Sequence, residues 1–265
     1  MSVLLTVGAI GVFITMVMVT YFFTVTRFSL VVQGLAGKNS PSSHIYWIYK
    51  SRPLIWITDR QPIISAILLW NYDRLVGNVV NRLGHSLHGK DVLQLSCAFG
   101  NISEKIAERC AWHKANLVIA DVIANELAHT KNKLDRRGLQ ASFKACDATA
   151  LPYPDKSFDC VISFFLFHEL PLEKKREVLK ESMRVMKPGG KIICGEFHRP
   201  RFLLLRITGK IFFTVFEKYA GEMWGTFNPE AEIRMCAGSP DKWKFSQKTF
   251  FGGNYCVFEA EKTPR

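Results

Sequence analysis

Small and acidic residues stand at turns of this chain where a nucleoside could bind. The strand-like run Val92–Leu95 ends in a turn that contains Ser96, Ala98 and Gly100 and opens a helical segment. Small residues let a ligand approach the backbone, and a helix N-terminus offers unpaired N–H groups to an anionic group. Asp121 follows the next strand-like run, where an acid can bond ribose hydroxyls.

A third turn completes this pattern. Asp147 lies between Cys146 and Ala148 after another strand-like run, and its carboxylate can accept a hydrogen bond from an adenine amino group. Acidic residues after strands are common, but three such turns in this order and spacing predict a nucleoside-binding crevice.

The elements that must position these turns alternate along the chain. Strand-like runs lie at 91–96, 117–121, 141–146, 158–164 and 191–197, and helix-like segments follow the first, second and fourth of them. This alternation predicts a mostly parallel sheet with helices on both faces. The runs Trp243–Phe250 and Tyr255–Glu261 flank a Gly-Gly-Asn turn and predict a terminal antiparallel hairpin. The expected fold class is therefore α/β, with a Rossmann-like sheet of seven strands.

Later motifs carry a family resemblance. Asp147-Ala148, the segment Leu151–Asp159 and the segment Arg184–Gly190 resemble class I S-adenosylmethionine-dependent methyltransferases, and within them the quinone and menaquinone methyltransferases. The resemblance covers Lys90 to the end and implies that fold, with S-adenosylmethionine as cofactor. The expected cofactor-binding residues are Gln94, Ser96, Cys97, Ala98, Gly100, Asp121, Val122, Asp147, Ala148 and Ser163.

The first turn departs from the family pattern. Typical members carry an acid and a G-x-G-x-G turn, whereas this chain has Gln94, Ser96 and Ala98 and keeps only Gly100. Each added side chain narrows the approach to the backbone, and the lost acid removes a charge that normally anchors the methionine ammonium. We therefore expect the cofactor to sit or react differently.

A narrower resemblance joins this altered turn to three other segments. Leu69–Leu75, Phe164–Glu169 and Glu196–Pro200 resemble the rhodoquinone biosynthesis protein family, over about Tyr46 to Trp224. The resemblance implies conversion of ubiquinone to rhodoquinone by exchange of a ring methoxy group for an amino group. It also implies S-adenosylmethionine as the nitrogen source and manganese as a divalent metal cofactor.

Two pairs of residues are candidates for metal binding and catalysis. His168 with Glu169, and Glu196 with His198, follow the fourth and fifth strand-like runs, which are neighbours in the methyltransferase topology. Mixed imidazole and carboxylate ligands suit Mn²⁺ or Fe²⁺. We expect His168, Glu169 and His198 to be catalytic, with either histidine as a base for direct methylation. Alternatively, His168 only caps the helix after Pro171 and His198 is a surface turn residue.

The N-terminus predicts a membrane anchor. Ser2 to Thr26 is a run of 25 residues without charge, long enough to cross a bilayer as a helix. A cleaved secretory signal is the alternative, but no Lys or Arg precedes the run. Basic residues from Arg27 onward place the catalytic part on the cytoplasmic side of a bacterial inner membrane or, alternatively, on the matrix side of a mitochondrial inner membrane.

The predicted organisation has four parts: an anchor at 1–33, a linker at 34–43, an aromatic helical cap at 44–89 and the methyltransferase-like domain at 90–265. Within the cap, Pro53 and Pro62 separate two helical stretches. The cap aromatics are expected either to pack in the core or to line a membrane or substrate. The apolar helix expected at 201–216 carries Arg206 and Lys210 and is either a core helix or an interfacial one.

Composition limits the remaining functions. The net charge of +12 is spread along the chain, and no base-reading element accompanies it, so we exclude a nucleic-acid partner. The seven cysteines include no C-x-x-C pair, which argues against a disulfide framework or a zinc–thiolate site.

The sequence thus predicts a membrane-bound enzyme that converts ubiquinone to rhodoquinone. The alternatives are a conventional quinone methyltransferase and a membrane quinone-binding protein without catalysis. The sequence leaves the oligomeric state open.

Overall fold

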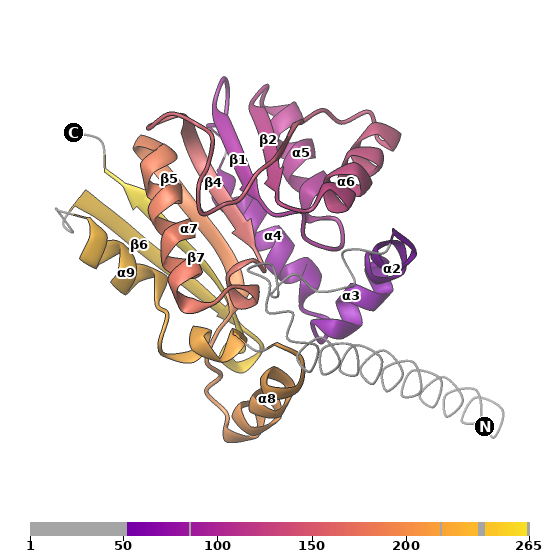
Figure 1. The fold of residues 1–265 in the computed structure, drawn as a ribbon, viewed down its shortest axis with the longest axis vertical. Helices are drawn as coiled ribbons and strands as arrows, with labels where there is room; N and C mark the ends of the chain where they lie inside the picture. The colour runs from indigo at the N-terminus through magenta and orange to yellow at the C-terminus, as the bar shows by residue number, and fades with distance from the viewer. Residues whose placement is uncertain (1–51, 85, 218, 238–241, 264–265) are drawn as a thin grey trace, which may run out of the picture.

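A seven-stranded mixed sheet forms the centre of the molecule (Figure 1). The computed structural model describes residues 52–84, 86–217, 219–237 and 242–263. The strand order is β3-β2-β1-β4-β5-β7-β6. The strands are β1 (Asp91–Leu95), β2 (Asn116–Asp121), β3 (Ser142–Ala145), β4 (Phe158–Phe164), β5 (Met186–Phe197), β6 (Trp243–Phe250) and β7 (Tyr255–Lys262).

The pairing of the strands confirms the predicted topology. The strands β1 to β5 pair in parallel, whereas β7 pairs antiparallel with both β5 and β6. β5 begins earlier than expected, because Met186 already pairs with Phe158 before the register shifts. The carboxyl ends of β1, β2, β4 and β5 therefore meet at one edge, where ligands bind in open α/β sheets.

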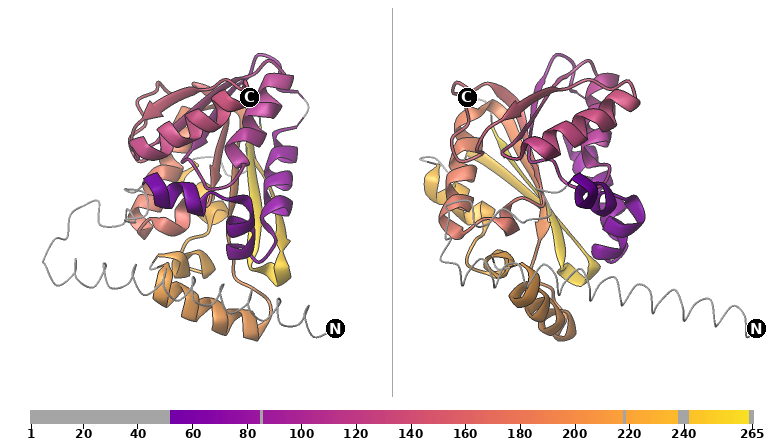
Figure 2. Two further views of the ribbon diagram at one scale, coloured as in Figure 1. Left: turned by 90° about the vertical axis from the view of Figure 1, so that its right-hand side faces the viewer. Right: turned by 45° about the vertical axis from the view of Figure 1, so that its right-hand side comes forward.

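Helices lie on both faces of this sheet (Figure 2). The described helices are α2 (Arg52–Thr58), α3 (Gln61–Ile67), α4 (Tyr72–Leu83), α5 (Ile102–Trp112), α6 (Ala124–Arg136), α7 (Leu172–Val185), α8 (Leu203–Phe216) and α9 (Pro229–Cys236). Three short 3-10 turns join them: η2 (Phe167–Glu169), η3 (Ala220–Trp224) and η5 (Phe251–Gly253). Pro53 and Pro62 lie in the first turns of α2 and α3, where a missing N–H costs no hydrogen bond, so they begin helices and do not merely separate them.

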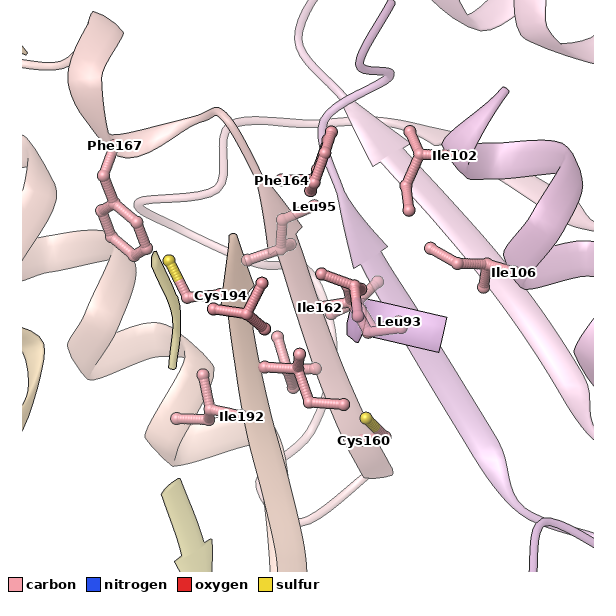
Figure 3. Packing of buried hydrophobic residues seen from close by; sticks show 14 of the residues in the cluster. Leu93, Leu95, Ile102, Ile106, Cys160, Ile162, Phe164, Phe167, Ile192 and Cys194 are labelled. Carbon is pink, nitrogen blue, oxygen red and sulfur yellow. The ribbon is translucent and has the colours of Figure 1, made fainter. Parts of the chain in front are cut away.

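The core lies between the strands and the helices that cover them. Leu93 and Ile162 come from neighbouring strands and Ile106 from α5, and all three are fully buried (Figure 3). Burial of such side chains is the main force that holds the strand ends in place.

The expected anchor and linker lie outside the described residues, as does the first part of the cap. In the part of the chain that the structure describes, no helix combines the length and apolarity needed to cross a membrane.

Candidate active site

A cleft of about 80 Å³ lies at the carboxyl ends of β1, β2 and β4. We call it the first cleft. Five of the residues predicted to bind the cofactor line it: Ser96, Cys97, Ala98, Asp121 and Val122. Glu126 of α6, Phe165 and Glu169 also line it, and sequence reasoning had not linked Glu126 or Phe165 to this site.

Asp121 joins the first two turns. One carboxylate oxygen accepts the Cys97 N–H at 2.6 Å, and the other accepts the Ile123 N–H at 2.7 Å. Burial raises the pKa of this carboxyl, and the hydrogen bonds from the backbone oppose that shift. Each carboxylate oxygen has a second lone pair, so Asp121 can still accept a hydrogen bond from a ligand hydroxyl.

The Gln94 side chain stabilises the altered first turn by hydrogen bonds. Its side-chain nitrogen donates to the Ser96 carbonyl oxygen at 2.9 Å and to Ser103 Oγ at 2.7 Å. Ser96 adopts a φ of +70°, a region that non-glycine residues rarely occupy. An acid at position 94 would set a carboxylate against the Ser96 carbonyl, whereas the amide donates to it. Gln94 is fully buried and does not line the cleft.

Gly100 is covered by the cap. It has a φ of +85°, and an added Cβ would lie 2.3 Å from the Tyr72 hydroxyl oxygen. Its N–H donates to Asp59 Oδ1 at 2.7 Å, and its carbonyl accepts from Lys133. His129 also contacts Asp59 at 2.9 Å. The glycine is therefore needed for packing against the cap, a role that the motif alone did not indicate.

The remaining predicted cofactor residues lie outside the first cleft. Asp147 is exposed after β3, and its Oδ1 accepts both the N–H and the hydroxyl of Thr149 at 2.8 Å. Ala148 packs on the core, and Ser163 is buried in β4 beside Leu95. The prediction that they bind the cofactor stays a prediction.

Glu126 gives the first cleft an unusual carboxyl group. It is 2% exposed, and its Oε1 atom has no hydrogen-bond partner within the described residues. Burial raises its pKa to about 9, with further contributions from the charges of Asp121, Asp59 and Glu169. The group is therefore protonated at neutral pH.

The donor set of the first cleft fits a sulfonium nucleoside. Asp121 and Glu169 bring two carboxylates to the cleft, which favours a positively charged ligand, and the protonated Glu126 adds a neutral carboxyl group. Asp121 stands where an acid can bond ribose hydroxyls. Ligand pockets typically measure roughly 300–1,000 Å³, so a ligand as large as S-adenosylmethionine requires the lining side chains to move apart.

His168 and Glu196 form a buried ion pair. His168 Nδ1 lies 2.9 Å from Glu196 Oε1, and the His168 backbone N–H donates to Glu196 Oε2 at 3.0 Å. Burial alone would lower the pKa of His168, but the Glu196 charge and hydrogen bond, aided by Glu217 and Glu169, raise it to about 9. His168 therefore carries a proton at neutral pH and is poorly suited to act as a base.

The other two predicted ligands lie apart from this pair. Glu169 lines the first cleft, whereas His198 Nδ1 lies 2.8 Å from the Gly253 carbonyl oxygen. Across the described ranges, no group of three or more His, Cys, Asp or Glu side chains is placed to hold a metal ion. The structure thus pairs His168 with Glu196, as strand adjacency predicts, and does not support a four-residue metal site.

A second cleft of about 130 Å³ lies between the ends of β5 and β7 and the segments η3 and α9. We call it the second cleft. Its lining is rich in aromatic rings and includes Glu196, Phe197, His198, Trp224, Phe227 and Phe258. The Gly253 carbonyl can only accept, so His198 Nδ1 carries the hydrogen of this contact, and Nε2 is the ring nitrogen outside it. His198 is thus an imidazole among the residues that line this cleft.

Three rings separate the two clefts. Phe165 lines the first cleft and Phe197 the second, with ring centroids 5.2 Å apart. The His168 ring lies 5.7 Å from Phe165 and 5.0 Å from Phe197. Phe165 has a φ of +52°, so the backbone is strained at this partition.

Comparison with known proteins agrees with this geometry. The family described as a methyltransferase domain matches residues 92–190. The ubiquinone/menaquinone biosynthesis C-methyltransferase UbiE of Cellvibrio japonicus is 33% identical over 119 residues, 44% of this chain and 47% of that protein. UbiE of Yersinia enterocolitica is 34% identical over 115 residues, 42% of this chain and 44% of that protein. The chain thus spans less than half the length of these relatives.

Solved structures share the fold at low sequence identity. One is a Haemonchus contortus phosphoethanolamine N-methyltransferase 2 in complex with S-adenosylhomocysteine. It has a TM-score of 0.56 and 15% sequence identity, and the match covers 74% of this chain and 54% of that chain. Another is the magnesium protoporphyrin IX methyltransferase of Synechocystis with bound S-adenosylhomocysteine. It has a TM-score of 0.52 and 18% sequence identity, and the match covers 73% of this chain and 84% of that chain. The fold is that of S-adenosylmethionine-dependent methyltransferases, as the sequence predicted.

Proposed function

We propose that this chain is an S-adenosylmethionine-dependent transferase that methylates a ring carbon of a quinone in its reduced, quinol form. The observation that carries the proposal is the first cleft, where Asp121 joins two turns at the carboxyl ends of neighbouring strands. The region that matches a methyltransferase domain, residues 92–190, contains the residues that line this cleft, and relatives named as quinone C-methyltransferases match 42–44% of the chain.

The first cleft would hold the methyl donor. When bound, S-adenosylmethionine supplies a methyl group activated by a positively charged sulfur. Asp121 accepts hydrogen bonds from ribose hydroxyls, and the Glu169 carboxylate, which lines the same cleft, stabilises the positive charge. Gln94 makes no ion pair with the ligand ammonium, because its amide is uncharged, and its side-chain nitrogen stabilises the turn instead.

The second cleft would hold the acceptor ring. Phe197, Trp224 and Phe227 offer flat apolar surfaces to an uncharged ring. In the transfer, the ring carbon forms a bond to the methyl carbon, the carbon–sulfur bonding pair returns to sulfur, and the ring carbon loses a proton. His198 Nε2 accepts that proton. Phe165 must move from the partition to bring the two ligands into contact.

A product assay tests the proposal. The full-length protein is incubated with S-adenosylmethionine that carries an isotopically labelled methyl group and with a quinol that has an unsubstituted ring carbon, and the quinones are analysed by mass spectrometry. We expect the label in the ring. In the Asp121→Asn variant, calorimetry should show at least about tenfold weaker binding of S-adenosylmethionine, since a charged hydrogen-bond acceptor is lost. If the wild-type protein does not bind S-adenosylmethionine, the proposed reaction is wrong, and the alternative of a quinone-binding protein without catalysis is supported.

Exchange of a ring methoxy group for an amino group is the second candidate. The observation that favours it is Gln94, because no carboxylate at this position pairs with the ligand ammonium. The same assay with ubiquinone, S-adenosylmethionine labelled at its amino nitrogen, and Mn²⁺ separates the two reactions. A product that has lost a methoxy group and gained labelled nitrogen supports exchange, whereas a product with an added labelled methyl group supports methylation.

A further inference from the structure

Helix α8 presents an apolar stripe that no described part of the molecule covers. Leu203 is 70% exposed, Leu204 72%, Ile207 50% and Ile211 59%. Their spacing of three, four and seven residues places them on one face of the helix. Phe202, at the start of α8, is also exposed and extends the stripe. The sequence left open whether this helix is a core helix or an interfacial one, and these exposures exclude the core.

The opposite face of α8 packs on the protein. An added Cβ at Gly209 would lie 2.7 Å from the Trp224 ring, and Phe213 packs against the same ring with centroids 4.9 Å apart. Thr208 and Thr214 donate their hydroxyls to carbonyl oxygens within the helix, so they present little free polarity. The helix is thus fixed with its apolar stripe outward.

The charges within the segment that carries this stripe are all positive. The segment 199–216 contains Arg199, Arg201, Arg206 and Lys210 and no acidic residue. Arg206 donates to the Pro200 carbonyl oxygen, and Lys210 is exposed. A helix with exposed apolar residues on one side and basic residues beside them is typical of attachment to an anionic lipid surface.

We propose that α8 docks this protein on a bilayer that contains anionic phospholipid, with Leu203, Leu204, Ile207 and Ile211 in the acyl boundary and the basic side chains at the headgroups. Figure 1 shows α8 at the opposite end of the molecule from α5, so only one end would face the lipid. Trp224 packs under α8 and also lines the second cleft. The lipid surface and the second cleft therefore share a wall. This proposal stands independently of the proposed reaction.

Hydrogen–deuterium exchange of the full-length protein tests the docking. Because the N-terminal apolar run can bind lipid by itself, the readout must come from α8 itself. The protein is mixed with phosphatidylcholine vesicles that contain or lack phosphatidylglycerol, and peptides from α8 are compared with peptides from α5. We expect phosphatidylglycerol vesicles to slow exchange in α8 by about fivefold or more and to leave α5 unchanged.

Two variants and one control sharpen this test. Leu204→Gln with Ile211→Gln should abolish the protection of α8, and both positions are exposed, so the fold should be preserved. Lys210→Gln should raise the phosphatidylglycerol needed for half of the protection by about fivefold. Trp112→Gln on α5 removes an 84% exposed apolar side chain elsewhere and should change nothing.

Three results would overturn the proposal. One is unchanged exchange in α8 while the protein is bound to the vesicles. A second is equal protection in the Leu204→Gln, Ile211→Gln protein. The third is protection of α8 from exchange in the absence of vesicles. Protection that grows with protein concentration would mean that a second copy of the protein covers the stripe. Protection that does not depend on protein concentration would mean that another segment of this chain covers it.

Discussion

The two clefts differ in the chemistry they offer, although a single layer of rings separates them. The first cleft brings together carboxyl groups from Asp121, Glu126 and Glu169, whereas four aromatic residues and His198 are among the residues that line the second. A positively charged ligand fits the former and an uncharged planar ring fits the latter. Under the proposed function, the donor and the acceptor of the transfer would therefore occupy separate clefts.

The clefts also differ in how they are held. The first cleft is fixed by long-range polar contacts to the cap, among them the Gly100 N–H to Asp59 and the Tyr72 hydroxyl to the Phe99 carbonyl. The second is walled by η3 and by the start of α9, and Trp224 of η3 packs against α8. We therefore expect substitutions near the first cleft to affect folding strongly and those in the second to affect turnover.

Gly100→Ala is the strongest test of the link between cap and first cleft. The new Cβ would collide with the Tyr72 ring, and the residue would keep a positive φ, so the variant should lose about 4 kcal/mol of unfolding free energy. Urea denaturation measures the loss. Gly77→Ala in α4 is the matched control, since nothing lies within 4 Å of its added Cβ, and it should gain about 0.5–1 kcal/mol. Equal stability of the two variants would contradict the packing role.

Glu196→Gln tests the ion pair in the partition. Removal of one partner from a buried pair should cost about 3 kcal/mol of unfolding free energy at neutral pH. The pKa of His168 is raised from 6.5 to about 9, so its contribution is full below pH 6.5 and is lost as the pH rises through 9. The difference between wild type and variant should therefore shrink from acid to alkaline pH. A difference that is constant with pH would show that the pair is not ionised.

His198→Gln tests the second cleft as the place of chemistry. Loss of a general base typically lowers turnover by about 100-fold or more. S-adenosylmethionine should still bind with wild-type affinity, because His198 does not line the first cleft. The labelled-methyl assay measures turnover and calorimetry measures binding. Weakened binding with normal turnover would place His198 at the donor and not at the acceptor.

Local sequence patterns were sufficient to predict the sheet. The alternation of apolar runs and helices gave the parallel strands, and the Gly-Gly-Asn turn gave the hairpin of β6 and β7. The turn residues Ser96, Asp121 and Val122 do meet in one cleft, because the carboxyl ends of neighbouring parallel strands share an edge.

Contacts distant in sequence could not be predicted in this way. Asp59 bonds Gly100 across 41 residues, and no periodicity encodes such a contact. Strand adjacency was enough to bring His168 to Glu196, but the directions of Glu169 and His198 depend on side-chain torsions and local turns. For the same reason, Glu126 resembled an ordinary helix residue until the structure showed it buried in the first cleft.

Glu126→Gln is expected to have the smallest effect, and it tests whether Glu126 is charged in the folded protein. The pKa of Glu126 is raised from 4.5 to about 9, so the folded protein must keep a proton that the unfolded chain releases. Wild-type stability is therefore reduced as the pH rises from 4.5 through 9, and the neutral amide escapes this loss. Between about pH 5 and pH 6.5, the stability of the variant relative to the wild type should rise by about 2 kcal/mol. A variant that is less stable at both pH values would mean that Glu126 is ionised and paired in the folded protein. The first cleft would then carry a full extra negative charge before any ligand binds, and its contrast with the second cleft would be sharper than the structure indicates.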